Sequence, residues 1–293
     1  MQDDALTPVE AATPDLAPHR GVAHALQAMQ AIVMRELFKF SQQTGRLVSA
    51  LVRPLLWLAV FAAGFRNVFG VAIVEPYDTY IPYDVYIAPG LVGMVLLFNG
   101  MQSSLAMVYD REMGLMRLLL TAPLPRAWLL FCKLCATGLL SVLQALAFIV
   151  VATLIGTDLP LFSLGGLHAL LALICGALML GALGLLLSVH IKQLENFAGT
   201  MNFVIFPMYF MSTALYPLWK LRESGAEWVY QLARFNPFTH AVEWIRFALY
   251  GKDPGEAPYI VLGCLAVFFV LACWGYDPQR GFGGLTKRGG GPP

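Results

Sequence analysis

The chain has 293 residues, of which 58% are hydrophobic and 13% are charged, about half the charged share of an average soluble domain. A soluble core of this size could not bury so much apolar surface, so the composition excludes an ordinary soluble domain. The net charge of +1 gives no sign of a nucleic-acid partner. These features predict an all-α integral membrane protein.

The N-terminal part of the chain is its most polar part. Residues 1–20 are rich in proline and acidic residues, lack the apolar core of a signal peptide and predict a disordered cytoplasmic tail. Residues 21–46 predict an amphipathic interfacial helix that is too polar to cross a membrane. It lies either in the membrane surface or against the rest of the protein. Its apolar stripe is formed by Leu26, Met29, Val33, Leu37 and Phe40.

Six segments are apolar enough to cross a hydrocarbon core of about 30 Å, which takes about 20 residues. Five of them contain no Lys, Arg, Asp or Glu. The first contains Arg66, which must reach an interface or end the helix. The six predicted transmembrane helices are residues 53–72, 85–108, 134–157, 165–189, 196–219 and 257–276. They form one membrane domain of residues 47–276, and residues 277–293 predict a second disordered cytoplasmic tail.

The distribution of basic residues predicts the orientation of the chain. Most of the 19 Lys and Arg residues fall on the N-terminal side of the membrane when the six spans are threaded in order. Cytoplasmic loops carry such an excess, so both termini are expected in the cytoplasm. The expected location is a bacterial inner membrane.

Residues 220–256, between the last two spans, do not resemble an ordinary loop. The segment is strongly apolar, and Asn236-Pro237 divides it into two helices too short to span. We therefore expect a re-entrant helix pair before the last span. Glu243 and Arg246 are three residues apart on one helical face and can pair with each other. Alternatively, they provide a polar lining at the exit of a translocation path.

Several motifs resemble those of the type-2 ABC exporter permease family. The resemblance runs from about residue 30 to about residue 275 and implies an exporter built from two permease subunits and two ATPase subunits. The motifs are Arg53-Pro54-Leu55-Leu56-Trp57, Tyr86-Ile87-Ala88-Pro89-Gly90-Leu91, Arg111-Glu112-x-Gly114-x-x-Arg117-Leu118-Leu119 followed by Ala122-Pro123-x-Pro125-Arg126, and Asn236-Pro237-Phe238-Thr239-His240-Ala241-Val242-Glu243-x-x-Arg246.

The expected contact with the ATPase lies between the second and third spans, in residues 109–126. Asp110 is expected to cap a short amphipathic helix that Pro123 stops, and a groove on a soluble partner would accept such a helix. The alternative is that its arginines anchor the topology at phosphate head groups. The predicted coupling residues are Asp110, Arg111, Glu112, Gly114, Arg117, Leu118, Pro123 and Arg126.

The chain has no phosphate-binding loop of the form G-x-x-x-x-G-K-[ST]. Its one Gly-Lys pair, Gly251-Lys252, is followed by Asp253. We therefore expect no catalytic residue, metal or cofactor in this chain, with ATP and Mg²⁺ bound by a separate ABC ATPase subunit. The other expected partners are a second permease copy, in a homodimer or heterodimer, and membrane lipid.

Two features leave alternatives open. Gly176, Gly181 and Gly184 in the fourth span predict close helix packing, either within one chain or across a dimer. Phe and Met residues in the fifth span either line a path for a hydrophobic or amphipathic substrate or face lipid. Two other functions compete with an exporter: an integral membrane enzyme of lipid metabolism, and a non-transporting assembly factor on the same scaffold. A membrane enzyme would need clustered acidic or histidine residues, which the spans lack.

Overall fold

The computed structural model describes residues 21–42, 44–65, 75–78, 80–113, 125–157, 159–160, 166–191, 194–223 and 225–276. These residues are largely helical, and no β-strand is assigned within these ranges. The predicted tails, residues 1–20 and 277–293, lie outside them. The helices are α1 Val22–Gln42, α2 Thr44–Phe65, α3 Tyr83–Glu112, α5 Arg126–Leu154, α6 Gly166–His190, α7 Leu194–Phe210, α8 Leu218–Glu223, α9 Glu227–Phe235, α10 Pro237–Leu249 and α11 Ala257–Gly275.

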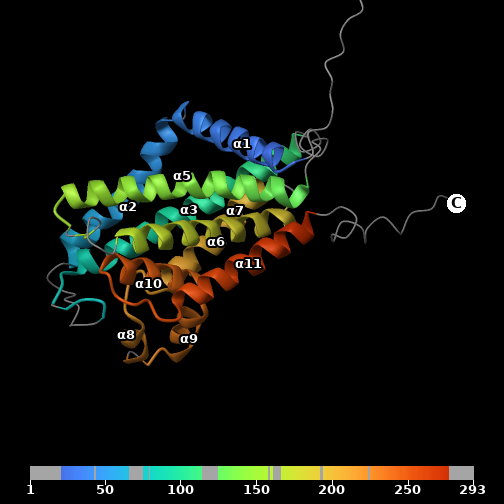
Figure 1. The fold of residues 1–293 in the computed structure, drawn as a ribbon. Helices are drawn as coiled ribbons and strands as arrows, with labels where there is room; N and C mark the ends of the chain where they lie inside the picture. The colour runs from blue at the N-terminus through green and yellow to red at the C-terminus, as the bar shows by residue number, and fades with distance from the viewer. Residues whose placement is uncertain are drawn as a thin grey trace, which may run out of the picture.

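Four helices in the described ranges are long and apolar enough to cross a membrane. They correspond to the second, third, fourth and sixth predicted spans. In Figure 1 these helices run side by side, with the start of α1 and the end of α11 at the same end of the bundle. The crossing segments are Tyr83–Tyr109, Arg126–Leu154, Gly166–His190 and Ala257–Gly275.

The first predicted span, residues 53–72, is described only up to Phe65. Helix α2, Thr44–Phe65, begins before the predicted start, and its apolar part within the described residues is Ala50–Phe61. The helix runs through Arg53, whose guanidinium carbon lies 4.1 Å from the centre of the Phe98 ring on α3. A cation over an aromatic face is stabilised by the ring, which favours this position of the exposed Arg53 side chain within α2. Arg66 lies outside the described residues.

The fifth predicted span is interrupted. A helix was expected over residues 196–219, but α7 ends at Phe210 and residues 211–216 form turns and bends. The local cause is Ser212, whose Oγ donates to the Tyr209 carbonyl at 2.6 Å and accepts from the Ala214 amide at 3.2 Å. Such side-chain bonds compete with those of the helix. Pro217 then restricts the residue before it.

Helix α6 occupies the centre of the bundle and packs most extensively against α3 and α11. A Cβ added at Gly184 would lie 2.7 Å from the Gly100 carbonyl oxygen of α3, and one at Gly181 would lie 2.8 Å from the Leu134 side chain of α5. Gly184 and Gly181 therefore allow close packing within one chain. Gly176 has only ordinary contacts, with the nearest atom 3.5 Å from its added Cβ.

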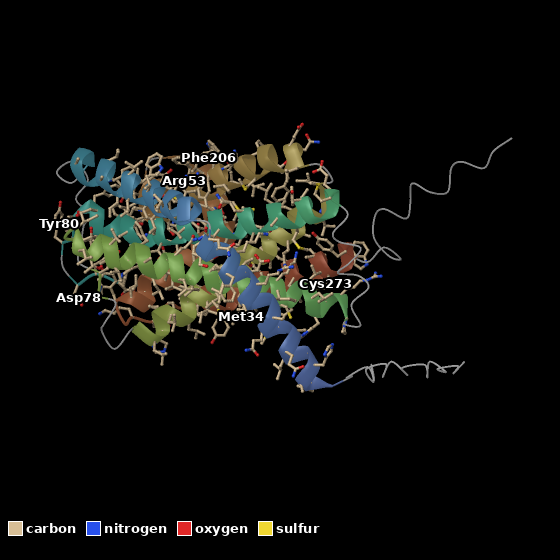
Figure 2. All side chains as sticks on the ribbon, turned by 90° about the horizontal axis from the view of Figure 1, so that it is seen from above. Met34, Arg53, Asp78, Tyr80, Phe206 and Cys273 are labelled. Atoms are coloured by element: carbon tan, nitrogen blue, oxygen red, sulfur yellow. The ribbon has the colours of Figure 1, made fainter. Side chains whose placement is uncertain are left out.

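Helix α1 crosses over α5 and meets α2 at an angle (Figures 1 and 2). The Trp128 indole of α5 donates a 3.1 Å hydrogen bond to the Ala25 carbonyl, which fixes one point of the crossing. None of the α1 residues is fully buried, and Phe38 keeps 61% of its side-chain surface exposed. The predicted helix of residues 21–46 corresponds to α1 up to Gln42, and residues 44–46 lie in α2.

Candidate functional site

The turn after α7 is held by side chains from distant parts of the chain. The Tyr83 hydroxyl of α3 donates to the Leu215 carbonyl at 2.7 Å, and the Tyr86 hydroxyl donates to the Thr213 carbonyl at 3.1 Å. Both tyrosines are buried, as are Thr213 and Leu215. Buried carbonyls without partners would destabilise the bundle, so these bonds make an irregular backbone tolerable there.

The Asn236-Pro237 junction is hydrogen-bonded to the chain at the start of this turn. Asn236 Nδ2 donates to the carbonyls of Met208 and Met211, at 2.7 and 2.8 Å. Its Oδ1 accepts from the Phe238 amide at 3.0 Å, which caps α10 at its first turn. Pro237 stands at the start of α10, where a missing N–H is tolerated. The junction therefore ends α9, begins α10 and binds the end of α7.

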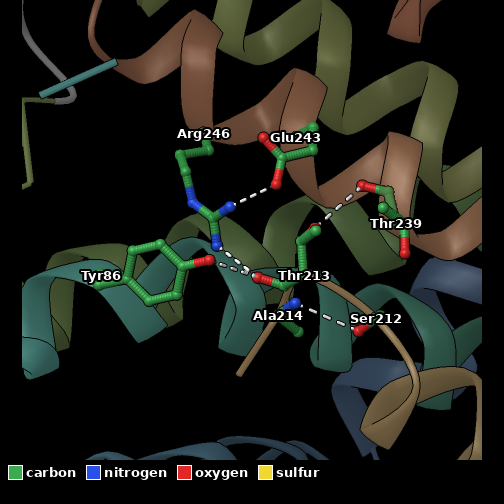
Figure 3. Close-up of polar contacts among 7 residues, drawn as sticks. All are labelled: Tyr86, Ser212, Thr213, Ala214, Thr239, Glu243 and Arg246. Carbon is green, nitrogen blue, oxygen red and sulfur yellow. Dashed lines mark hydrogen bonds and ion pairs between the residues drawn. The ribbon is translucent and has the colours of Figure 1, made fainter. Parts of the chain in front are cut away.

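Arg246 lies at the centre of the network drawn in Figure 3. Its Nη1 lies 2.5 Å from Glu243 Oε1, and its Nη2 donates to the Thr213 carbonyl at 2.7 Å. Its guanidinium carbon lies 4.2 Å from the centre of the Tyr86 ring. Arg246 retains only 2% of its side-chain exposure, whereas Glu243 retains 25%. One buried cation thus joins α10, the turn and α3.

A cavity of about 170 Å³ adjoins the network. Tyr77, which precedes α3, packs nearby against Tyr86 and Tyr250. Burial raises the pKa of the Tyr77 hydroxyl to about 12, against the opposing effect of the Arg246 charge, so Tyr77 stays neutral at physiological pH. The arrangement is suited to holding helices together, and two acidic residues, Glu75 and Glu243, line the cavity. The cavity is lined by Glu75, Tyr86, Thr213, Pro217, Leu218, Trp219, Glu243 and Arg246.

The same turn also depends on a close approach of α3. A Cβ added at Gly90 would lie 2.4 Å from the carbonyl oxygen of Ala214 and 2.7 Å from its Cα. These are backbone atoms, which cannot move aside as a flexible side chain can. Only glycine therefore lets α3 lie this close to the turn.

The predicted coupling residues fall at the ends of α3 and α5. Asp110, Arg111 and Glu112 are in the last turn of α3, so the expectation that Asp110 caps a separate short helix is wrong. The helix continues through Asp110 because residues 109–112 contain no proline or glycine that would end it at the predicted membrane boundary. Arg126 is exposed as the first residue of α5. Gly114, Arg117, Leu118 and Pro123 lie outside the described residues.

The four predicted residues of the segment before the last span do come together. Asn236 and Pro237 form the junction, and Glu243 and Arg246 form an ion pair. Sequence analysis did not identify Thr213, Tyr83 or Tyr86 as their partners. The available signal was the run Ser212-Thr213 between Pro207 and Pro217, since hydroxyl residues between prolines favour turns.

Within the described residues, no group of three or more His, Cys, Asp or Glu side chains is placed to hold a metal ion. The arrangement of Arg246, Glu243 and the tyrosines resembles a structural anchor. Removing one partner of a buried ion pair costs much, because the other charge is then left without compensation.

Comparison with known proteins gives a consistent assignment. The sequence model of the family described as ABC-2 type transporter matches residues 27–250. The chain is 31% identical over 233 residues to a protein of Porphyra purpurea named as a transport permease, ycf38, covering 78% of this chain and 76% of that protein. It is 30% identical over 228 residues to the protein of that name from Cyanophora paradoxa, covering 76% and 74%.

A more distant relative is the daunorubicin resistance ABC transporter permease protein DrrB1 of Streptomyces coeruleorubidus. The identity is 23% over 253 residues, covering 85% of this chain and 86% of that protein. The family match spans most of the chain and includes α2, α3, α5, α6, α7 and the Arg246 network. The chain therefore belongs to the ABC-2 type transporter family and is a membrane-embedded transport permease subunit.

Proposed function

We propose that the chain is the membrane-spanning subunit of an ATP-driven exporter and works with a separate ABC ATPase. One observation carries the proposal: the family match covers residues 27–250, yet the sequence has no phosphate-binding loop. The energy for transport therefore comes from a partner ATPase or from an ion gradient, and the lack of Asp and Glu in the five uncharged predicted spans favours the ATPase. The competing enzyme function has less support, since no group of three or more His, Cys, Asp or Glu side chains is placed to hold a metal ion among the described residues.

The proposed orientation places both termini and residues 109–126 on the cytoplasmic side. The excess of basic residues in these parts supports it. The described ends of this segment, Glu112 and Arg126, are exposed and lie where α3 ends and α5 begins. An ATPase docked there could move two neighbouring membrane helices at once.

The proposed assembly contains a second permease copy, with lipid around both. Exposed apolar faces on α2 and α7 support a helix partner or lipid against these two helices. On α2, Val52, Leu56 and Val60 are exposed, and on α7, Phe203 and Phe206 are exposed. Apolar surface of this kind is stable only against lipid or another apolar face. The proposed substrate is hydrophobic or amphipathic.

The docking role predicts a specific effect of Arg117→Glu. A charge-assisted hydrogen bond at the contact is worth about 1.5–3 kcal/mol, so charge reversal should weaken ATPase binding at least tenfold. Insertion should remain normal, because Arg111 and Arg126 still mark the cytoplasmic side. The measurement is the amount of ATPase that co-purifies with the chain, compared with the amount of chain in the membrane.

Arg222→Glu is the matched control, since Arg222 is an arginine on α8, near the opposite end of the bundle. It should leave ATPase retention unchanged. If Arg117→Glu lowers membrane yield while the inserted protein keeps its ATPase, the arginine is a topology anchor. Normal yield with full retention would also contradict the docking role.

A further inference from the structure

Arg53 places a charged side chain deep within the membrane domain. Its guanidinium carbon lies 4.1 Å from the centre of the Phe98 ring. Phe98 is near the middle of the membrane-crossing segment Tyr83–Tyr109, roughly 22 Å and 16 Å along the helix from its two ends. An arginine at this depth is costly against lipid chains and usually faces a polar cavity, a pathway or an opposite charge. The position of Arg53 therefore calls for a polar contact.

Arg53 has no acidic partner in the part of the chain that the structure describes. Its side chain is exposed, and it forms no ion pair or hydrogen bond with the described residues. The Phe98 ring stabilises a cation but does not neutralise its charge. A cavity of about 20 Å³ lies beside the guanidinium, between α2 and α3, and has room for one water or one ligand oxygen. The cavity is lined by Ala50, Arg53, Pro54, Met94, Val95, Phe98, Asn99 and Gln102.

A second polar side chain in this lining also lacks a partner. Gln102 is half-buried on α3, and its amide makes no hydrogen bond with the residues that the structure covers. Arginine carries five N–H donors and glutamine two. Such donors suit a carboxylate or phosphate oxygen, and the lining contains no Asp or Glu that competes for them.

A row of aromatic rings lies next to Arg53. Trp57 follows it by one turn of α2, and the Trp57 ring lies 5.3 Å from Phe61 and 6.4 Å from Phe210 of α7. Phe206 stacks on Phe210 at 6.2 Å, and Figure 2 shows Arg53 and Phe206 on the same side of the bundle. Phe206 and Phe210 are 48% and 38% exposed, so the row is open to an apolar chain. This face of α2 and α7 therefore combines a cation with an apolar surface.

We infer that this face binds the transported substrate as an anionic amphiphile, with its carboxylate or phosphate at Arg53 and Gln102. The apolar part of the substrate lies along Trp57, Phe210 and Phe206. The substrate then lies between this face and the proposed second permease copy. This inference rests on the proposed transport function and narrows its substrate to molecules with a negative charge. A neutral or cationic amphiphile would leave Arg53 without a counter-charge.

Native mass spectrometry of the purified full-length chain tests the binding with three single-chain probes: lysophosphatidic acid, a fatty acid and a monoacylglycerol, all of equal acyl length. The two anions should bind more tightly than the neutral monoacylglycerol. Arg53→Gln should weaken lysophosphatidic acid binding about tenfold, because one charge-assisted contact is lost, and leave monoacylglycerol binding unchanged. Gln102→Leu should weaken the binding of the anions about threefold, since a neutral hydrogen bond is lost. Arg53→Lys should keep the preference for the anions.

Arg222→Gln is the matched control, because Arg222 is an exposed arginine on α8 that also lies near an aromatic ring, 6.0 Å from Tyr230. It should bind all three probes as the wild type does. If Arg53 only packs α2 against α3, Arg53→Gln will lower the unfolding midpoint and keep the preference for the anions. That result, or equal binding of the three probes to the wild type, would overturn the inference. Displacement of lysophosphatidic acid by an equal concentration of inorganic phosphate would also count against it, since the aromatic row would then contribute nothing.

ATP hydrolysis by the complex of the chain with its ATPase separates a transported molecule from a resident lipid. Lysophosphatidic acid should stimulate hydrolysis with the wild type and with Arg222→Gln, but not with Arg53→Gln. Charge-dependent binding without stimulation would assign the site to a resident lipid and overturn the assignment to a substrate. Absence of any co-purified ATPase would instead contradict the proposed function, and the binding measurement on the chain alone would stand.

Discussion

Arg246→Met should destabilise the chain by about 3 kcal/mol, near the lower end of the range for breaking a buried ion pair. The side chain is 2% exposed and joins Glu243, the Thr213 carbonyl and the Tyr86 ring. Methionine fills much of the space but replaces none of these bonds. Glu243, a quarter exposed, can recover some hydration, so the upper end of the range does not apply.

The measurement is the midpoint of thermal unfolding of the purified chain in detergent. Arg222→Met is the matched control, because Arg222 lies on the short outer helix α8 and contacts the Tyr230 ring only at 6.0 Å. It should unfold close to wild type. Arg246→Met combined with Glu243→Leu should recover part of the loss, since the unpaired carboxylate is also removed. Equal midpoints for Arg246→Met and Arg222→Met would show that the network does not hold the turn.

Gly90→Val is the second substitution expected to have a large effect. Its Cβ would overlap the Ala214 backbone, at 2.4 Å from the carbonyl oxygen and 2.9 Å from the carbonyl carbon. Helix α3 or the turn must therefore shift, and overpacking of this kind costs about 1–3 kcal/mol or more. The hydrogen bonds of Tyr83 and Tyr86 to the turn should be lost with the shift, which adds to the cost.

Gly263→Val on α11 is the control for the loss of a helical glycine. A Cβ at Gly263 would meet nothing within 4 Å, so only intrinsic helix propensity changes there. Yield from the membrane and the unfolding midpoint should fall for Gly90→Val and remain unchanged for Gly263→Val. A Gly90→Val protein that unfolds with the wild-type midpoint would contradict the close packing of α3 on the turn.

The long apolar helices could be predicted because an uncharged apolar run of spanning length identifies a membrane-crossing helix directly from the sequence. Their boundaries were less accurate: α5 begins at Arg126, not at residue 134, and α3 continues to Glu112, not to residue 108. Hydropathy measures the part of a helix that fits the hydrocarbon layer. It does not register helical turns that continue beyond that layer.

The interrupted helix α7 could not be predicted from its own composition. Residues 196–219 are uncharged and apolar, which is compatible with one continuous span. The turn persists because Tyr83, Tyr86 and Arg246 provide donors for its carbonyls, from positions far away in the sequence. Such partners are fixed by packing, which a local pattern does not contain. The Glu243–Arg246 pair, by contrast, follows from a spacing of three within one helix.

The central claim is that this permease receives its energy from a separate ATPase. The most direct test is affinity purification of the tagged full-length chain from membranes of its own host, followed by measurement of ATP hydrolysis. The chain has no phosphate-binding loop, so any hydrolysis must come from a co-purified subunit. We expect Mg²⁺-dependent hydrolysis that disappears when the lysine of the partner's phosphate-binding loop is replaced. The claim would be contradicted by a pure, folded chain that co-purifies with no ABC ATPase and shows no ATP hydrolysis.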